Sequence, residues 1–262
     1  MAVSGNPIIL TGAASGVGDA TARQLIERGH QVISLDIKEP SAAVAAHHHC
    51  DLSDPASIAA TAAKLDGRYG SLLNVAGVPG TVGDEKTIAV NILGLRHLTG
   101  LLWDRIADGG TIVNVASIAG NQWRVRRKLI AELLATDSFE AGLDWWRGHA
   151  EAVDIDSYTF SKEAVVVYTM QLAVQGMARG IRVNDVGPGP VETPIFPDFT
   201  EAVGAELMQD MVDRVGRAGQ PSDIAEALVV LAEGDISWLN GQHIIVDGGL
   251  MAGFWSGARR AS

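Results

Sequence analysis

Short apolar runs alternate along the chain with longer amphipathic stretches. The apolar runs contain few polar positions and are bounded by turn residues, which predicts strands buried on both faces. We expect strands at 6–10, 31–36, 44–50, 71–77, 111–117, 181–187 and 242–248. We expect helices at 19–29, 55–67, 84–108 and 161–178, where apolar residues recur at helical spacing. This alternation is typical of one doubly wound α/β domain over residues 1–262, with a parallel sheet and helices on both faces.

Composition and charge narrow the class of partner. Of the 262 residues, 47% are hydrophobic, and the formal net charge is −11. The acidic balance argues against nucleic acid or an anionic membrane as the main partner. Cys50 is the single cysteine, so an internal disulfide is excluded, which fits a cytoplasmic protein. We find no pattern of a signal peptide and no apolar run long enough for a membrane span.

A glycine-rich turn follows the first expected strand. Its residues include Gly12, Ser15, Gly16, Val17 and Gly18. Glycines at this place allow a tight turn and bring backbone N–H groups against a pyrophosphate at a helix start, as in Rossmann-type folds. The alternative is a plain strand–helix turn. Asp36, which closes the second strand, favours the nucleotide: its carboxylate can accept both adenosine ribose hydroxyls and repels a 2′-phosphate, which indicates NAD rather than NADP.

Two further features surround the end of the third expected strand. Asp51 and Leu52 lie where a carboxylate could meet the adenine amino group. The alternative for Asp51 is a helix N-cap region, in which Asp54 is the better cap candidate. The three histidines His47–His49 suggest a metal, but neighbours on a strand point to opposite faces and cannot converge on one ion. We therefore expect no metal site.

Tyr158 and Lys162 form a candidate acid–base pair. They are four residues apart at the start of an expected helix, and therefore on one face. A phenol is a poor base at neutral pH, and an ammonium beside it stabilises the phenolate and lowers its pKa. Taken alone, the pair is more often an ordinary surface i,i+4 pair.

A set of motifs occurs in an order found in one enzyme family. The set comprises Thr11–Gly18, Asn74–Gly77, Asn91, Ser117, Tyr158–Lys162, Pro188-Gly189 with Thr193, Gly216-Arg217 with Pro221–Ile224, and Val246–Gly249. Through this combination the chain resembles the short-chain dehydrogenase/reductase family over essentially its whole length. The resemblance implies an oxidoreductase in which hydride moves directly between NAD and a substrate carbon.

The resemblance also implies a role for each matching position. Tyr158 would be the general acid/base, and Ser117 would hold the substrate oxygen. Lys162 would bind the nicotinamide ribose and lower the pKa of Tyr158, and Asn91 would support a water relay from the lysine to solvent. The glycine-rich turn, together with Asp36, Asp51, Leu52, Tyr158 and Lys162, would contact the cofactor. The resemblance adds further cofactor contacts, namely Asn74, Ala76, Gly77, Pro188, Gly189, Val191 and Thr193.

Two departures from the common family pattern point to a subgroup. The connection from Asn74 to Asn91 is short, and the segment between Ser117 and Tyr158 is long. Both features are similar to the bacterial 3α-hydroxysteroid dehydrogenase/carbonyl reductases and related alicyclic alcohol dehydrogenases. The extra residues, about 121–154, predict a helical hairpin inserted before Tyr158.

The inserted hairpin is expected to be a lid or pocket wall, because it leaves and re-enters the chain at the edge of the site. The alternatives are a subunit contact or an inert elaboration. Trp145 and Trp146 are neighbours on a helix, so we expect them not to face one core: one packs on the domain body and the other faces the pocket or a neighbouring subunit. We expect the basic run 124–128 to be a solvated helix face.

A second pocket wall is expected from residues 194–215. Its candidates are Ile195, Phe196 and Phe199, which join Trp145, Trp146, Ser117 and Tyr158 in the expected substrate pocket. An apolar pocket with one polar point suits a hydrophobic alicyclic secondary alcohol of steroid or terpenoid type, or its ketone. The alternatives are a 3-oxoacyl thioester reductase and a non-enzymatic nucleotide sensor. The family's usual state implies a homo-oligomer, with a tetramer favoured over a dimer.

Overall fold

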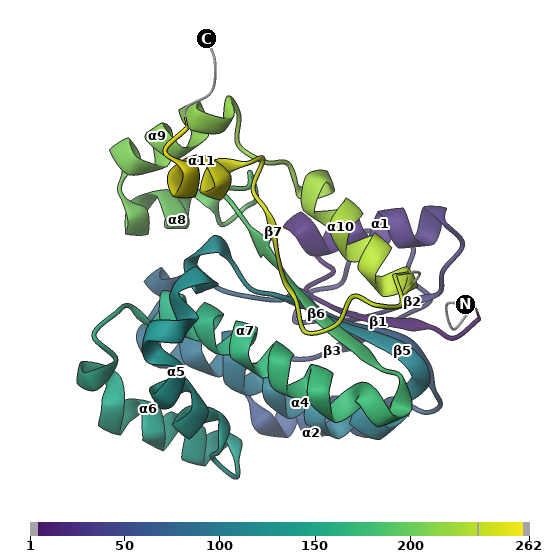
Figure 1. Cartoon of the computed structure of the whole chain (residues 1–262). Helices are drawn as coiled ribbons and strands as arrows, with labels where there is room; N and C mark the ends of the chain where they lie inside the picture. The colour runs from purple at the N-terminus through teal and green to yellow at the C-terminus, as the bar shows by residue number, and fades with distance from the viewer. Residues whose placement is uncertain (1–4, 235, 259–262) are drawn as a thin grey trace.

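The fold is a parallel seven-stranded sheet with helices on both faces, which confirms the expected class (Figure 1). The computed structural model describes residues 5–234 and 236–258. The strand order is β3-β2-β1-β4-β5-β6-β7, and every neighbouring pair is parallel. The strands are β1 (Ile8–Thr11), β2 (Val32–Asp36), β3 (Ala46–His49), β4 (Tyr69–Asn74), β5 (Ile106–Val115), β6 (Arg182–Pro188) and β7 (His243–Val246).

Helices cover both faces of this sheet, and further helices lie outside these two layers (Figure 1). They are α1 (Gly16–Glu27), α2 (Pro55–Lys64), α3 (Asp84–Ile88), α4 (Leu95–Leu102), α5 (Trp123–Leu134), α6 (Phe139–Val153), α7 (Ser157–Gly176), α8 (Phe196–Val203), α9 (Ala205–Val215), α10 (Pro221–Glu233) and α11 (Leu250–Ser256). Helices α2, α4 and α7 share one hydrophobic cluster with the sheet, and α1 and α10 share the other. Figure 1 shows α5 and α6 lying outside α7.

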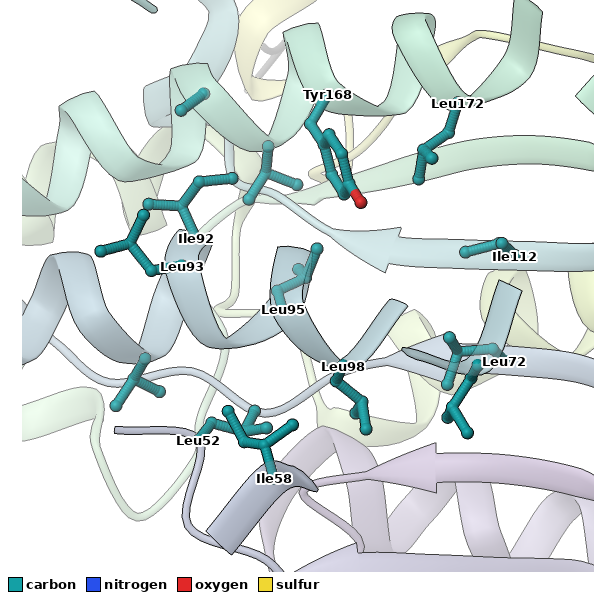
Figure 2. Close-up of a cluster of buried hydrophobic side chains, with 14 of the residues drawn as sticks. Leu52, Ile58, Leu72, Ile92, Leu93, Leu95, Leu98, Ile112, Tyr168 and Leu172 are labelled. Atoms are coloured by element: carbon teal, nitrogen blue, oxygen red, sulfur yellow. The ribbon is translucent and has the colours of Figure 1, made fainter. Parts of the chain in front are cut away.

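The cluster on the α7 side is the larger part of the core. Leu95 and Leu98 of α4 and Leu172 of α7 are buried with Leu72 and Ile112 of the sheet (Figure 2). The strands are apolar on both faces because a helical layer covers each one. Within residues 5–234 and 236–258, none of the helices has the length and hydropathy needed to span a bilayer.

The α5–α6 hairpin is fixed to α4 through Arg96. The Arg96 guanidinium donates to the carbonyls of Leu133 (2.9 Å), Leu134 (3.1 Å) and Ser138 (3.0 Å) and to the Thr136 hydroxyl (2.9 Å). The carbonyls of Leu133 and Leu134 lie at the end of α5, where backbone acceptors lack helical partners, and Ser138 is the N-cap of α6. One arginine therefore closes the turn between α5 and α6.

A buried ion pair fixes the same hairpin to α7. Arg126 of α5 donates to both carboxylate oxygens of Glu163, at 2.7 and 2.6 Å, and the Glu163 side chain is fully buried. The expectation of a solvated face is therefore wrong for Arg126, although Arg124, Arg127 and Lys128 are exposed. Because Glu163 follows Lys162, the pair ties the hairpin to the segment of α7 that carries the candidate lysine.

Some element boundaries differ from the predicted ones. The expected helix at 84–108 ends by Arg105, because Ile106 already pairs with Tyr69 in the sheet. Helix α10 was not among the expected helices, although Pro221 opens it and Gln220 and Asp223 form a capping box there. Helix α10 completes the layer over the second face of the sheet.

Candidate active site

Ser117, Tyr158 and Lys162 come together at the carboxyl end of β5. Ser117 follows that strand, and Asp156 caps α7 by accepting from the Thr159 N–H (2.8 Å), which places Tyr158 and Lys162 in the first turns of the helix. The Lys162 Nζ lies 5.7 Å from the centroid of the Tyr158 ring. The Ser117 hydroxyl is close enough to Tyr158 to lower the pKa of the phenol.

Burial dominates the ionisation of both Tyr158 and Lys162. Burial raises the pKa of Tyr158 to about 12, against the opposing effect of the Ser117 hydroxyl and with a small further rise from Asp156. Burial lowers the pKa of Lys162 to about 8, and Asp185 opposes this shift. The expected lowering of the Tyr158 pKa by Lys162 is not seen in this arrangement, in which the lysine donates to the Val115 carbonyl (2.9 Å).

Asn91 connects α7, through Ser161, to the loop after β4. It lies in a π-helical turn, Ala89–Gly94, a rare geometry that recurs at functional sites. Its side chain accepts from the Val78 N–H (2.9 Å) and donates to the Val78 carbonyl (3.0 Å) and the Ser161 hydroxyl (3.2 Å). A side-chain carbon at Gly77 would lie 3.4 Å from both Asn91 Oδ1 and Lys162 Nζ. Asn91 and Lys162 therefore meet beside the same glycine.

The glycine-rich turn has no room for side chains. A carbon at Gly12, which has φ of 76°, would lie 2.8 Å from the Ala76 Cα, and one at Gly18 would lie 1.9 Å from the Gly12 carbonyl oxygen. Gly16 has φ of 54° and faces Thr193. A side-chain carbon at Gly16 would lie 3.3 Å from the Thr193 methyl carbon. The turn thus brings β1, the loop after β4 and the loop after β6 together.

The start of α1 leaves backbone donors free for an anion. Ser15 is the N-cap residue, is exposed, and makes no side-chain capping bond; Val17 in the first turn is half-buried. The first N–H groups of a helix lack helical partners and attract phosphate. The glycine cradle and this uncapped helix start therefore fit the pyrophosphate of a dinucleotide.

Asp36 lies beside this turn at the end of β2. Its two carboxylate oxygens accept from the Ala14 N–H (3.0 Å) and the Lys38 N–H (2.9 Å). Each carboxylate oxygen has further lone pairs, and the side chain is only partly buried, so a ribose can still reach it. The position fits an adenosine ribose.

Asp51 and Leu52 lie after β3, and their side chains have different surroundings. The Asp51 carboxylate accepts from the N–H (2.8 Å) and hydroxyl (2.6 Å) of Ser53, and Asp54 caps α2 by accepting from the Ala56 N–H, as expected. The Leu52 side chain is buried in the core, so only its backbone is available to a cofactor.

Asn74, one of the expected cofactor contacts, uses its side chain within the fold. Its side chain is buried and donates to Asn114 Oδ1 (2.8 Å) and to the Thr99 hydroxyl (3.1 Å), so it joins the sheet to α4.

The remaining expected cofactor residues lie at the end of β6 and just beyond it. Pro188 ends that strand, Gly189 packs against Asp247, and Val191 is buried and bridged to Gly219.

One aromatic residue of the expected second wall reaches Tyr158. The Phe199 ring of α8 packs against the Tyr158 ring, with centroids 5.0 Å apart. Ile195 and Phe196, at the start of α8, are half-buried. The structure therefore places α8, through Phe199, against the candidate acid/base.

The two tryptophans of α6 pack together on α7. Trp146 is buried, and its ring centroid lies 5.7 Å from that of Phe160; the Trp145 centroid lies 6.0 Å from Phe160 and 4.4 Å from His149. The expectation that the pair could not face one core is wrong, because the Phe160 ring is large enough for both indoles to contact it. Phe160 projects from a different side of α7 than Tyr158, so these contacts lead into the core and not to Tyr158.

Sequence reasoning missed a polar chain beneath the site. Asp185 of β6 and His243 of β7 are hydrogen-bonded, and His243 Nε2 lies 3.2 Å from Asn121 Oδ1. The signal was an acidic residue inside an otherwise apolar strand, IRVNDVG, which has to find a partner when both faces are covered.

Two family models match most of the chain. One, described as short chain dehydrogenase, matches residues 6–128. The other, described as enoyl-(acyl carrier protein) reductase, matches residues 143–251. The residues between the two matches, 129–142, lie in the α5–α6 hairpin.

Individual relatives are similar over nearly their whole length. A coniferyl-alcohol dehydrogenase of Pseudomonas sp. (strain HR199 / DSM 7063) is 36% identical, over 95% of this chain and 98% of that protein. A cis-4-hydroxycyclohexanecarboxylate dehydrogenase of Sinomonas cyclohexanicum is 30% identical, over 93% and 96%. The crystal structure of the 3-alpha-hydroxysteroid dehydrogenase from Pseudomonas sp. B-0831, complexed with NADH, superimposes with a TM-score of 0.78 at 28% identity, over 97% and 99%.

Proposed function

The chain belongs to the short-chain dehydrogenase family of oxidoreductases, and we propose that it uses NAD to interconvert a hydrophobic, ring-bearing alcohol and its carbonyl compound. The observation that carries this proposal is the convergence of Ser117, Tyr158 and Lys162 beside the glycine-rich turn. In open α/β sheets, ligands bind at this carboxyl edge.

Proton handling is the part of the chemistry that we assign to Tyr158. In oxidation its phenolate accepts the proton of the substrate hydroxyl, and in reduction its phenol returns a proton to the carbonyl oxygen. Ser117 donates a hydrogen bond to that same oxygen. Although Lys162 does not lower the pKa of Tyr158 in the arrangement described above, its ammonium lies 5.7 Å from the centroid of the Tyr158 ring, and we assign to it the stabilisation of the phenolate in the reacting complex. NAD, when bound, supplies the hydride acceptor.

Lys162 also has the reach to hold the nicotinamide ribose. Its Nζ lies near Gly77, on the loop that packs against the glycine-rich turn. The Val115 carbonyl, which accepts from the ammonium, holds one of its three N–H donors, so the others are free for a ribose hydroxyl and for the relay through Asn91.

The substrate class rests on the apolar wall and on the relatives. Phe199 lies against Tyr158, with Ile195 and Phe196 at the start of the same helix. The relatives are named for alcohols that carry a ring: coniferyl alcohol in one case, and cis-4-hydroxycyclohexanecarboxylate and a 3-alpha-hydroxysteroid in the others. We therefore widen the expected substrate from alicyclic secondary alcohols to ring-bearing alcohols in general.

For the cofactor we propose NAD, because Asp36 lies at the end of β2 beside the glycine-rich turn, where its carboxylate can accept from the adenosine ribose hydroxyls. The negative charge repels a 2′-phosphate, and the exposed Ile37 that follows offers it no partner. Lys38 is the nearest cation in the sequence, but only its backbone N–H bonds to Asp36 in this structure.

We also propose that the protein is cytoplasmic and forms a homo-oligomer, a tetramer or a dimer. Light scattering on the purified protein tests the number of subunits.

A substrate screen tests the proposed function. Purified protein is assayed for NADH formation from coniferyl alcohol, cyclohexanol and a 3α-hydroxysteroid, and for NADH consumption with acetoacetyl thioesters. Turnover of at least one ring-bearing alcohol with NAD, and none of the thioester, supports the proposal. Turnover of the thioester alone favours the 3-oxoacyl thioester reductase, and binding of NAD without any turnover favours a nucleotide sensor.

A further inference from the structure

Asp185 and His243 form a buried pair between neighbouring strands. The two residues are in register on β6 and β7, and the His243 Nδ1 donates to the Asp185 carboxylate. The Asp185 side chain is fully buried, and that of His243 is 10% exposed. An acidic side chain in such a place costs several kcal/mol of desolvation, roughly, unless its partners compensate. A pair of this kind therefore needs a structural or chemical reason.

The pair reaches the turn that carries Ser117. A side-chain carbon at Gly187 would lie 2.5 Å from the His243 Cε1 and 3.4 Å from the Ser117 carbonyl carbon, so the imidazole and the Ser117 backbone meet over this glycine. His243 Nε2 lies 3.2 Å from Asn121 Oδ1, in the turn that Ser117 caps. His243 therefore contacts the turn Ile118–Gln122 at Asn121 and lies across Gly187 from the Ser117 backbone.

The same pair lies beside the part of the sheet to which Lys162 bonds. The Lys162 ammonium donates to the carbonyl of Val115, which is in register with Val186, the residue after Asp185. Asp185 faces Asn114 of β5, His243 of β7, and Thr169 and Lys162 of α7. Among these groups only Lys162 and His243 are cationic or can become so. The Asp185 carboxylate is thus placed to offset the cost of burying the lysine charge.

We propose that Asp185 and His243 are positioning residues of the active site, with Asp185 acting as the buried counter-charge of Lys162 and His243 fixing the turn that carries Ser117. The inference rests on the catalytic roles proposed above for Ser117 and Lys162. No covalent step is involved: the pair acts by holding charge and geometry around groups that contact the substrate and cofactor.

The protonation of the pair supports this role. One ring nitrogen of His243 bonds to the Asp185 carboxylate and the other lies against the Asn121 side-chain amide, so both nitrogens are engaged by neighbours on either side of the ring. Burial raises the pKa of Asp185, while the hydrogen bond and charge of His243, then Thr169 and Lys162, act against that rise. Burial lowers the pKa of Lys162 and Asp185 opposes it, so each charge supports the other.

The test measures the ionisation of Lys162 directly. The protein is labelled with carbon-13 lysine, Lys162→Arg assigns the Lys162 signal, and its titration is followed by NMR without added cofactor. In Asp185→Asn we expect Lys162 to lose its proton at a lower pH than in the wild type. His243→Asn leaves Asp185 without its partner and raises the carboxyl pKa further, so it moves Lys162 in the same direction. Asp66→Asn, an exposed control with the same change in net charge, should not move it.

The kinetic readout separates positioning from folding. The pH at which alcohol oxidation stops rising should move in Asp185→Asn by the same amount as the Lys162 titration, and His243→Asn should lower kcat by about tenfold through the displaced Ser117. Unchanged Lys162 titration in both variants overturns the inference, even if their melting temperatures fall. Because the titration needs no substrate, it remains decisive if the proposed alcohols are not turned over.

Discussion

The Phe199 ring packs edge-on against the Tyr158 ring, with centroids 5.0 Å apart and planes inclined by 62°. Tyr158 belongs to α7 and Phe199 to α8, so the contact joins the catalytic helix to the segment that follows β6. An apolar substrate that reaches the phenol has to lie beside this ring or displace it. Phe199 is therefore the wall residue most directly placed to distinguish substrates.

Replacing Phe199 by Ala should weaken selection for ring-bearing alcohols. We expect kcat/KM for the preferred ring alcohol to fall about tenfold, because one apolar contact in a pocket contributes roughly 1–3 kcal/mol. Phe196→Ala, one turn earlier on α8 and also half-buried, is the matched control and should have the smaller effect. Equal losses in the two variants would show that the contact with Tyr158 has no special weight.

Asp36 should govern the choice between NAD and NADP. Asp36→Ala removes the charge that repels a 2′-phosphate, so the ratio of kcat/KM with NAD to that with NADP should fall by about tenfold or more. Asp36→Asn is the informative companion, because its amide oxygen can still accept from the Ala14 N–H that supports the turn. A wild-type preference for NADP is the result that contradicts this assignment.

Trp146 should matter for stability and not for substrate binding. The side chain is buried and packs on Phe160, so Trp146→Ala should lower the free energy of unfolding by about 3–5 kcal/mol. Trp238 is 98% exposed, and Trp238→Ala should change the free energy of unfolding by less than about 0.5 kcal/mol. Denaturant unfolding measures both. A raised KM with unchanged stability in Trp146→Ala would return this residue to the pocket wall.

The raised pKa of Tyr158 gives the two reaction directions different pH dependences. Oxidation needs the phenolate, whose population grows with pH because the pKa is about 12, whereas reduction needs the phenol, which predominates throughout the neutral range. We expect kcat/KM for oxidation to rise up to about pH 8, where Lys162 begins to lose its ammonium, and then to stop rising. Reduction should show no such rise. A reduction rate that climbs in parallel with oxidation would contradict the assignment of the proton to Tyr158.

Much of the sheet could be predicted, because strands buried on both faces leave continuous apolar runs such as NPIIL and QVISLD. The ends of the strands and helices could be predicted less well from the sequence. The chain at 106–107 continues the apolar pattern of the preceding helix, and only pairing with Tyr69 makes it a strand. The start of α10 does carry a local signal, because Pro221 and the capping box of Gln220 and Asp223 mark it in the sequence.

The candidate site was predictable where its residues lie close in sequence or carry a family motif. Tyr158 and Lys162 are one helical turn apart, and Ser117 follows a predicted strand. The partners that pin the site are not local: His243 meets Asp185 across 58 residues, and Arg126 meets Glu163 across 37. The contacts of Trp145 and Trp146 likewise depend on Phe160 of another helix. Such pairings depend on topology, and local periodicity does not encode them.

The most direct test of the account is the activity of Tyr158→Phe with NAD and a ring-bearing alcohol, measured beside its affinity for NAD. The substitution removes the hydroxyl and keeps the ring that packs against Phe199. The account predicts that kcat falls by roughly 100- to 10,000-fold while the Kd for NAD changes little, because the phenol handles the proton and the glycine-rich turn holds the dinucleotide. Oxidation at the wild-type rate by Tyr158→Phe would contradict the central claim.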